Sequence, residues 1–346
     1  MCLVLALLCT NCGKKSEPPP PLDGSSGFVS ANHSFPADAL KPDSISRYSD
    51  YDFYYVADQL VFLGEKDSIR YVVNVKFARG LNNSRYLRAE HDFTGYYYDG
   101  KKWIVLPYTR ARHDSTELTD LTDYYFGGCY FSEPYQTGLL RYDRHGVKFE
   151  VSFSDLKPVQ NFERQGVGRR AHAIGSASLA VGGDTITGTL FYQSFQLDGF
   201  NPLVDRWQGV EFINYDWLGL LSEAGGRLVL ASDSTTSNDM IYKNFLSRLR
   251  GDTLLYAEGA DYVRINSDKV RRDNKIFDFL ALEKSVRIAE LDLELTLELT
   301  EKRFFYTSGF CLAIVEGEIM FAGEKESVWG ILEHKQQSKS DDRVLY

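Results

Sequence analysis

The sequence predicts an all-β protein made of two consecutive antiparallel β domains, each a barrel or a sandwich. Hydrophobic and polar residues alternate with a period of two from about residue 50 onward, which is typical of half-buried strands. Helical periodicity is scarce, because only residues 237–249 suggest a short helix, and they could equally form a strand. Turn signals separate the alternating stretches at Asp99-Gly100, Gly182-Gly183, Gly225-Gly226 and Glu316-Gly317-Glu318.

Two segments show the strand pattern most clearly. In residues 71–77 the odd-numbered positions are apolar and the even-numbered positions are mixed. In residues 286–300, Val286 and Ile288 share one phase, whereas the leucines from 291 to 299 share the opposite phase. One inserted residue exchanges the two faces of a strand, so we expect one long strand with a β-bulge at Ala289-Glu290.

Breaks in this pattern divide the chain. Residues 13–45 are rich in Pro and Ser and too polar to form a core, so they are expected to be a flexible tether. The alternation is interrupted again near residues 155–170. We therefore expect a first β domain over residues 46–165, a second over 166–335 and a polar tail over 336–346.

The first twelve residues form an apolar run that ends at Cys12. A short apolar segment that ends at a cysteine and precedes a Pro-rich stretch is typical of a bacterial lipoprotein signal peptide. Acyl chains on Cys12 would anchor the protein to a membrane. The sequence thus predicts a lipoprotein of the bacterial cell envelope, facing the periplasm or the cell surface, and an ordinary secretory signal is the alternative.

Composition excludes one class of partner. The chain of 346 residues has 39 Lys and Arg against 48 Asp and Glu, a net charge of −9, which does not suit a phosphate backbone, so no nucleic-acid partner is expected. Outside the leader only Cys129 and Cys311 remain, without the paired spacing of a zinc site. They are either bridged or, as we favour, two buried thiols, and we expect neither metal nor cofactor.

Three segments of the second half carry a family resemblance. They are VGGDTITGTLFYQSFQL (181–197), YDWLGLLSEAGGRLVL (215–230) and YTSGFCLAIVEGEIMFAGEKESVWGILE (306–333). In this order they resemble the tandem lipocalin-like family that includes carotenoid hydratases of the hydroxyneurosporene synthase type. The resemblance covers about residues 175–335. It implies two successive lipocalin-like β domains with an apolar ligand site between or within them.

One departure from this family bears on function. The family's enzymes carry an Asp-His pair where this chain has Gln193-Ser194, and a glutamine cannot donate a proton as a carboxylic acid does. The resemblance therefore favours an apolar cavity over hydratase chemistry. If the protein is an enzyme, Asp216 is the candidate acid. The residues expected to contact a ligand, unless they only fill the core, are Phe191, Tyr192, Gln193, Phe195, Trp207 and Trp217.

Three further titratable residues flank or close the second predicted domain. His172 and His334 would meet only if the first and last strands of that domain pair, as they do in a closed barrel. Glu333 lies on the last strand, and a buried carboxylate there would need a partner such as an arginine or a tyrosine hydroxyl. A structural role is expected for each of them.

These observations predict an envelope-anchored lipoprotein that binds an apolar, lipid or isoprenoid-like ligand in a β-barrel cavity, without catalysis. The alternative is a hydratase-like or isomerase-like enzyme that acts on an alkene or polyene. A second alternative is a structural surface lipoprotein that binds glycan or protein through exposed tyrosines.

Overall fold

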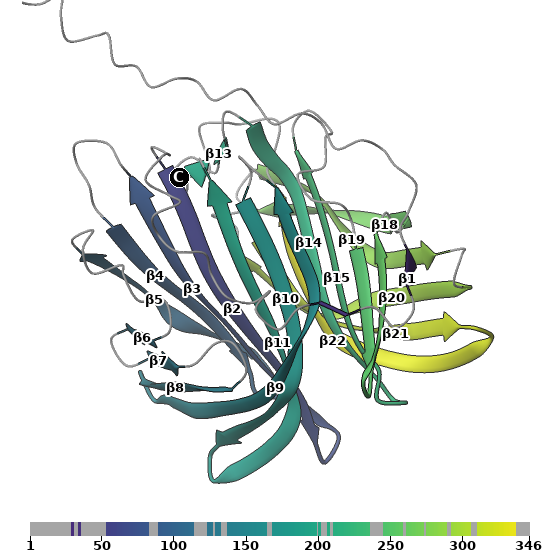
Figure 1. The fold of residues 1–346 in the computed structure, drawn as a ribbon, viewed down its shortest axis with the longest axis horizontal. Coiled ribbons are helices and arrows are strands. Elements are labelled where there is room, and N and C mark those ends of the chain that lie inside the picture. The colour runs from purple at the N-terminus through teal and green to yellow at the C-terminus, as the bar shows by residue number, and fades with distance from the viewer. Residues whose placement is uncertain are drawn as a thin grey trace, which may run out of the picture.

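The computed structural model describes two large antiparallel sheets and no helix among the residues that it covers (Figure 1). These residues are 29–30, 34–35 and 53–336, except for gaps at 83–88, 114–122, 127–128, 133–136, 165–167, 199, 202–205, 208–209, 236–244, 259–260, 273–274, 289–291 and 306–309. Both the leader with Cys12 and the polar tail after residue 336 lie outside the described residues. Within the described part, no helical segment has the length and apolar character needed to span a bilayer.

The first sheet holds ten strands in the order β5-β4-β3-β2-β11-β10-β9-β8-β7-β6. Its strands are β2 (Phe53–Lys66), β3 (Ile69–Asn82), β4 (Ala89–Tyr98), β5 (Trp103–His113), β6 (Asp123–Phe126), β7 (Cys129–Ser132), β8 (Gly138–Arg144), β9 (Val147–Arg164), β10 (Gly168–Val181) and β11 (Asp184–Asp198).

The second sheet has the main order β1-β17-β16-β15-β14-β22-β21-β20-β19-β18, and β12 and β13 pair beside β14. Its strands are β1 (Val29–Ser30), β12 (Phe200–Asn201), β13 (Arg206–Trp207), β14 (Val210–Ser222), β15 (Arg227–Thr235), β16 (Phe245–Arg250), β17 (Thr253–Glu258), β18 (Asp261–Arg272), β19 (Lys275–Ile288), β20 (Leu293–Phe305), β21 (Phe310–Phe321) and β22 (Glu324–Gln336).

The two sheets share one topology. In each sheet the first long strand, β2 or β14, pairs with the last, β11 or β22, and the intervening strands follow in the same sequence on either side. By this correspondence β2 matches β14, β3 matches β15, β10 matches β21 and β11 matches β22. The chain is therefore a structural duplication, although no internal sequence repeat is visible.

Alternation along the strands creates three apolar cores. In the first sheet one core is rich in aromatic rings, such as the stacked Tyr142 and Phe149, whose centroids are 5.4 Å apart. The core of the second sheet is aliphatic and includes Leu218, Leu295 and Leu332. The third core contains residues of both sheets, which face each other there. We call this layer, where the sheets pack together, the junction.

Three expectations from the sequence are corrected by these strands, and one open alternative is decided. β9 and β10 pair with each other, so the expected boundary near residue 165 falls inside the first sheet, and the change of sheet follows Asp198. The phase switch near Ala289 is a hairpin between β19 and β20, not a bulge, because Ile288 pairs with Leu293. Gly317 lies inside β21 and not in a turn. Of the two possibilities for residues 237–249, the strand is the one observed in their last part, where β16 begins at Phe245.

Gly330 allows a close approach of two strands of the second sheet. A β-carbon built at Gly330 would lie 2.0 Å from the carbonyl oxygen of Gly219 on the paired strand β14. We expect Gly330→Ala to push β14 and β22 apart and to lower the free energy of unfolding by about 1–3 kcal/mol, measured by urea denaturation. Gly182→Asn is the matched control, because its φ of 61° suits asparagine and its surroundings are open. Wild-type stability in Gly330→Ala would contradict this strand packing.

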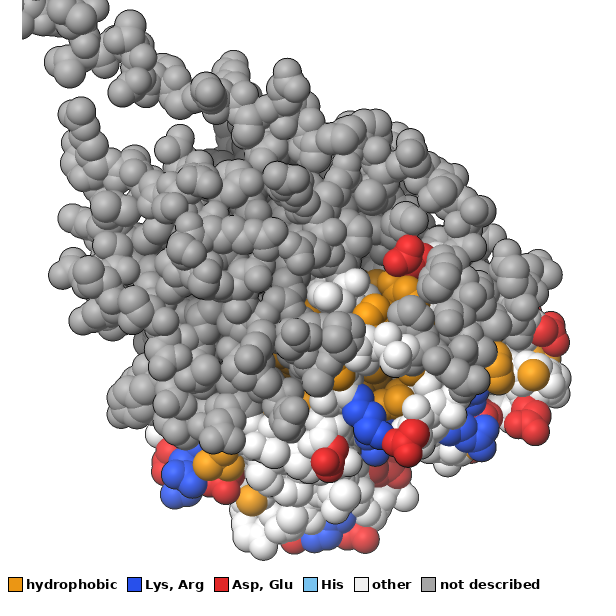
Figure 2. Space-filling view, in the orientation of Figure 1, with side chains coloured by type: hydrophobic (Ala, Val, Ile, Leu, Met, Phe, Trp, Pro, Cys, Tyr) orange, Lys and Arg blue, Asp and Glu red, His pale blue; other side chains and the backbone are white. Residues whose placement is uncertain are grey.

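The described surface in Figure 2 carries mixed charge around the hairpin end of the molecule, with hydrophobic side chains showing nearer the middle of the view. Several of these charges are exposed pairs, such as Lys148 with Asp143 at 2.9 Å and Lys325 with Glu318 at 2.7 Å. Exposed pairs of this kind contribute about 0–1 kcal/mol each to the free energy of unfolding, so they add little to the stability of the fold.

Candidate functional site

A row of four buried polar side chains crosses the face of the first sheet that packs in the junction. Gln160 pairs with His172, His172 with Gln193, and Gln193 with Gln59, on the adjacent strands β9, β10, β11 and β2. Directly paired residues share a face of the sheet. Val61 lies two residues after Gln59, hence on the same face, and belongs to the junction core, so all four side chains face the junction. The exposed fractions of the four side chains are between 0% and 3%. We call these residues the polar row.

The polar row is costly for stability. Transfer of an amide into an apolar environment without compensating hydrogen bonds costs about 1–3 kcal/mol in proteins. Packed sheets ordinarily bury apolar side chains at such positions, as the second sheet does at Leu312 and Ala231. A polar row in this place therefore marks the junction as the candidate site.

Glu333 of β22 meets this polar face from the second sheet. Its Oε1 accepts hydrogen bonds from Gln59 Nε2 at 2.7 Å and from Asn74 Nδ2 at 2.9 Å. Gln59 Nε2 also donates to Asn74 Oδ1 at 3.0 Å, which holds both amides in place. Glu333 itself is 6% exposed. A carboxyl group is thus held between the sheets by side chains of β2 and β3.

Burial raises the pKa of Glu333 above its ordinary value, and the Asn74 amide, the Lys76 ammonium, the Gln59 amide and the Arg170 guanidinium oppose that rise only in part. The carboxyl group therefore keeps its proton to a higher pH than an exposed glutamate does. Because Oε1 accepts both amide bonds, the proton of the neutral acid resides on Oε2. This arrangement is that of a buried proton donor.

His172 Nε2 and Trp217 Nε1 are buried nitrogen atoms of the junction that have no hydrogen-bond partner among the described groups. His172 is fully buried, and its Nδ1 lies 2.9 Å from Gln160 Oε1. Trp217 pairs directly with Glu333 across β14 and β22. Buried polar atoms are nearly always hydrogen-bonded in proteins, so these two are natural contacts for a bound molecule.

Half of the side chains expected to contact a ligand face the junction. Phe191, Gln193 and Trp217 lie there, and the rings of Phe191 and Trp217 are edge to face with centroids 6.3 Å apart. Tyr192 points to the opposite face of the first sheet, where its hydroxyl donates to Asp58 Oδ1 at 2.6 Å. The side chains of Phe195 and Trp207 lie outside the described part of the structure. The six residues therefore do not form one lining.

Asp216, the acid expected for an enzyme, faces away from the junction. It is completely buried in the second sheet's own core, and its Oδ1 lies 2.6 Å from His334 Nδ1. Neighbours in a strand point to opposite faces, so Asp216 and Trp217 cannot share one site. His334 pairs with Asp216 and not with His172, because β10 and β22 belong to different sheets.

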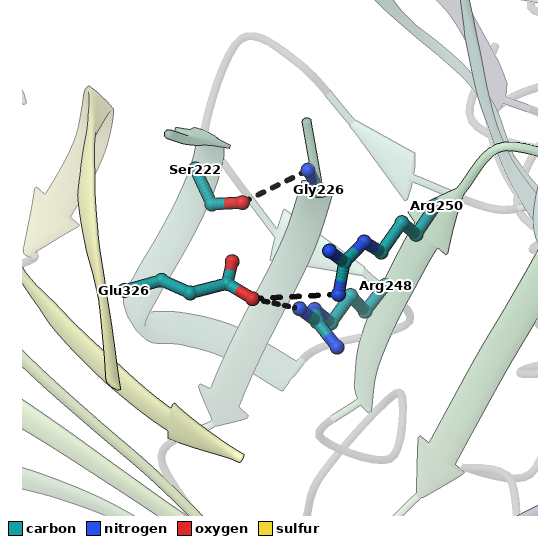
Figure 3. A network of polar contacts seen from close by, with 5 residues as sticks. All are labelled: Ser222, Gly226, Arg248, Arg250 and Glu326. Carbon is teal, nitrogen blue, oxygen red and sulfur yellow. Dashed lines mark hydrogen bonds and ion pairs between the residues drawn. The ribbon is translucent and has the colours of Figure 1, made fainter. Parts of the chain in front are cut away.

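A second polar network lies at the hairpin end of the second sheet (Figure 3). Glu326 Oε1 is 2.9 Å from an Arg248 nitrogen and 3.6 Å from an Arg250 nitrogen, while Ser222 Oγ accepts from the Gly226 amide at 2.8 Å. Burial acts to raise the pKa of Glu326, but Ser222 and the two guanidinium groups outweigh it, so the pKa is lowered. Seven residues of β22, about 23 Å, separate this ion pair from Glu333. The ion pair therefore stabilises the hairpin end of the second sheet and is not part of the candidate site.

The described residues offer no group of three His, Cys, Asp or Glu side chains suited to a metal ion. Cys311 is buried, as the sequence leads us to expect, and the side chain of Cys129 lies outside the described part of the structure. Sequence reasoning noticed Glu333 and His172 but missed Gln59, Asn74 and Gln160. Their only signal was an amide in an otherwise apolar strand, as at Gln59 before Leu60 and Val61.

No protein-family model matches the chain, and no curated protein matches it by sequence. Solved structures do match it. The crystal structure of a putative AttH from Nitrosomonas europaea has a TM-score of 0.56 at 14% identity, covering 83% of this chain and 93% of that one. Kievitone hydratase from Nectria haematococca has a TM-score of 0.56 at 11% identity, covering 90% and 98%. At these identities the likeness shows the fold alone, and it confirms the lipocalin-like, all-β fold with two successive units that the sequence predicts.

Proposed function

We propose that the protein binds a small, largely apolar molecule in the junction and transfers a proton to it from Glu333, as an enzyme of the hydratase or isomerase type. The observation that carries this proposal is a buried carboxyl group with a raised pKa, held by two amides where the polar row meets the second sheet. An acid whose pKa lies near the working pH is an efficient proton donor.

The chemistry follows from this donor. Protonation of one alkene carbon by Glu333 leaves a cation on the other carbon, and the carboxylate that remains is stabilised by Gln59 and Asn74. Capture of the cation by water, with loss of one proton, completes a hydration. Loss of a proton from a neighbouring carbon instead completes an isomerisation. Kievitone hydratase, which shares the fold, is a hydratase by name, and this analogy supports the reaction class without establishing it.

Binding without catalysis is the second candidate. It is favoured by the apolar rings of Phe191 and Trp217 in the junction and by the Gln193-Ser194 sequence where the family's enzymes carry Asp-His. The glycan-binding or protein-binding alternative has less support, because five described tyrosines are at most 7% exposed: Tyr97, Tyr98, Tyr142, Tyr192 and Tyr256.

The test is native mass spectrometry of the full chain, followed by organic extraction of any bound molecule and its incubation with the protein in D2O. Deuterium on a carbon atom of the recovered molecule, or a mass gain of one water, supports the enzyme. A molecule that binds and is returned unchanged supports a binding protein. No bound molecule, and no uptake from a panel of lipids and polyenes, contradicts both.

We also propose that acyl chains on Cys12 anchor the protein to the bacterial cell envelope, with the membrane as its partner. The support is the apolar leader and the Pro-rich segment after it. We expect the wild type to be labelled by a palmitate analogue and to sediment with membranes, and Cys12→Ser to lose both properties. Cys9→Ser is the matched control. Unlabelled wild type would contradict the anchor.

A further inference from the structure

We infer that His172 is the base of this site: a neutral imidazole, protonated on Nδ1, whose Nε2 accepts a proton from water or from the bound molecule. The inference rests on the proposed function and adds to it the second group that a hydration or an isomerisation needs. It makes the junction an acid–base pair, with Glu333 on the second sheet and His172 on the first.

The tautomer follows from one contact. His172 Nδ1 lies 2.9 Å from Gln160 Oε1, and an amide oxygen can only accept a hydrogen bond. Nδ1 therefore carries the hydrogen, and Nε2 presents its lone pair. Nε2 is buried and has no hydrogen bond of good geometry to a described group, and the side chain of Gln193 is the polar neighbour beside the ring. An unused acceptor in such a place is the mark of a site that a ligand or a water completes.

The surroundings keep the ring neutral. The groups that face it are Gln160 on β9, Arg170 on its own strand, Gln193 on β11 and the Phe245 ring on β16, with ring centroids 5.0 Å apart. Burial lowers the pKa of His172 well below its ordinary value, and the positive charge of Arg170 lowers it further, while the Gln193 amide opposes the change. Burial thus favours the neutral form of both groups, an imidazole that can accept a proton and a carboxylic acid that can give one, which is the division of roles that acid–base catalysis requires.

The placement suits a small molecule. In the polar row, Gln193 alone separates His172 from Gln59, whose amide holds Glu333. Two strand spacings amount to about 10 Å between the backbones of His172 and Gln59. In a hydration, Glu333 gives its proton to one alkene carbon, water forms a bond to the other, and Nε2 takes the proton that this water releases. Return of that proton from His172 to Glu333 through solvent restores both groups.

The experiment is ¹⁵N NMR of the histidine side chains of the full chain, with the His172 signal assigned by its loss in His172→Gln. Phenol is the probe, because its hydroxyl can donate to Nε2 and its ring suits an apolar junction. We expect the Nδ1–H tautomer of neutral His172 throughout pH 5.5–8, and a saturable shift of its Nε2 resonance on addition of phenol. The resonances of His145, at the exposed β8–β9 turn, should not move with phenol.

Three results would overturn the inference: an Nε2–H tautomer, a midpoint of titration near the ordinary histidine value, or an Nε2 resonance that phenol leaves unchanged. All are measured on the wild type, and the variant serves only to assign the signal. They are also distinct from failure of the proposed function. If deuterium transfer is absent while His172 behaves as expected, the junction binds ligands without the chemistry.

Discussion

Glu333→Gln is expected to reduce proton transfer to the bound molecule about 10²–10⁴-fold, the usual contribution of a general acid. The amide has the size of the carboxylic acid and can still accept bonds from Gln59 and Asn74, so the fold is expected to persist. The measurement is the rate of deuterium transfer from D2O to the molecule extracted from the protein. Glu294→Gln, on the exposed face of β20, is the control and should react like the wild type.

The raised pKa of Glu333 also predicts that the stability of the wild type depends on pH, in a way that Glu333→Gln removes. Below the ordinary Glu pKa of 4.5 the carboxyl group is protonated in the folded and unfolded chains, so it costs nothing. As the pH rises, the unfolded chain ionises first, whereas the folded chain must ionise a buried group. The wild type therefore loses stability as the pH rises from 4.5 through the raised pKa, and Glu333→Gln is spared this loss. Parallel pH profiles of the two proteins in urea denaturation would show that Glu333 is not a perturbed acid.

Asp216→Ala is expected to have the largest effect on stability. It leaves His334 Nδ1, which is 2.6 Å from Asp216 Oδ1 in the wild type, without its buried partner. A buried polar group left without its hydrogen-bond partner typically costs about 1–3 kcal/mol, and more where the group is charged. Urea denaturation measures the loss, and a double-mutant cycle with His334→Ala isolates the coupling between the two groups.

Asp143→Ala is the matched control, because its partner Lys148 is exposed and such pairs contribute about 0–1 kcal/mol. Asp216→Asn separates stability from chemistry. If Glu333 is the acid, this variant retains deuterium transfer. If instead Asp216→Asn abolishes the transfer and Glu333→Gln does not, the acid is Asp216 inside the second sheet, and the junction is not the reactive site.

The duplication explains how one site arises from two similar units. Gln59 and Gln193 are directly paired between the first and last long strands of the first sheet, and Trp217 and Glu333 are directly paired between the first and last long strands of the second. The first unit thus supplies amides and the second supplies an acid and an indole.

The sequence by itself determined the all-β class, the lipocalin-like resemblance and the face of most strands. Period-two alternation is a local property, so the leucines of β20 are buried and Glu294 and Glu298 are exposed, as their spacing predicts. Turn chemistry is equally local, and Gly182, Gly183 and Gly225 adopt positive φ at hairpins. The change of phase between β19 and β20 does not distinguish two paired strands from one bulged strand, because both exchange the faces of the alternation.

Only the tertiary structure decided which residues meet. Gln59 and Glu333 are 274 positions apart, and Asp216 and His334 are 118 apart, so no local pattern relates them. Their contacts depend on which strands pair across a sheet and on which faces of the two sheets pack together. Both choices follow from the summed burial of many apolar side chains. The chemical role of a buried amide or acid depends on that packing, because the sheet that covers the side chain determines its hydrogen-bond partners and its pKa.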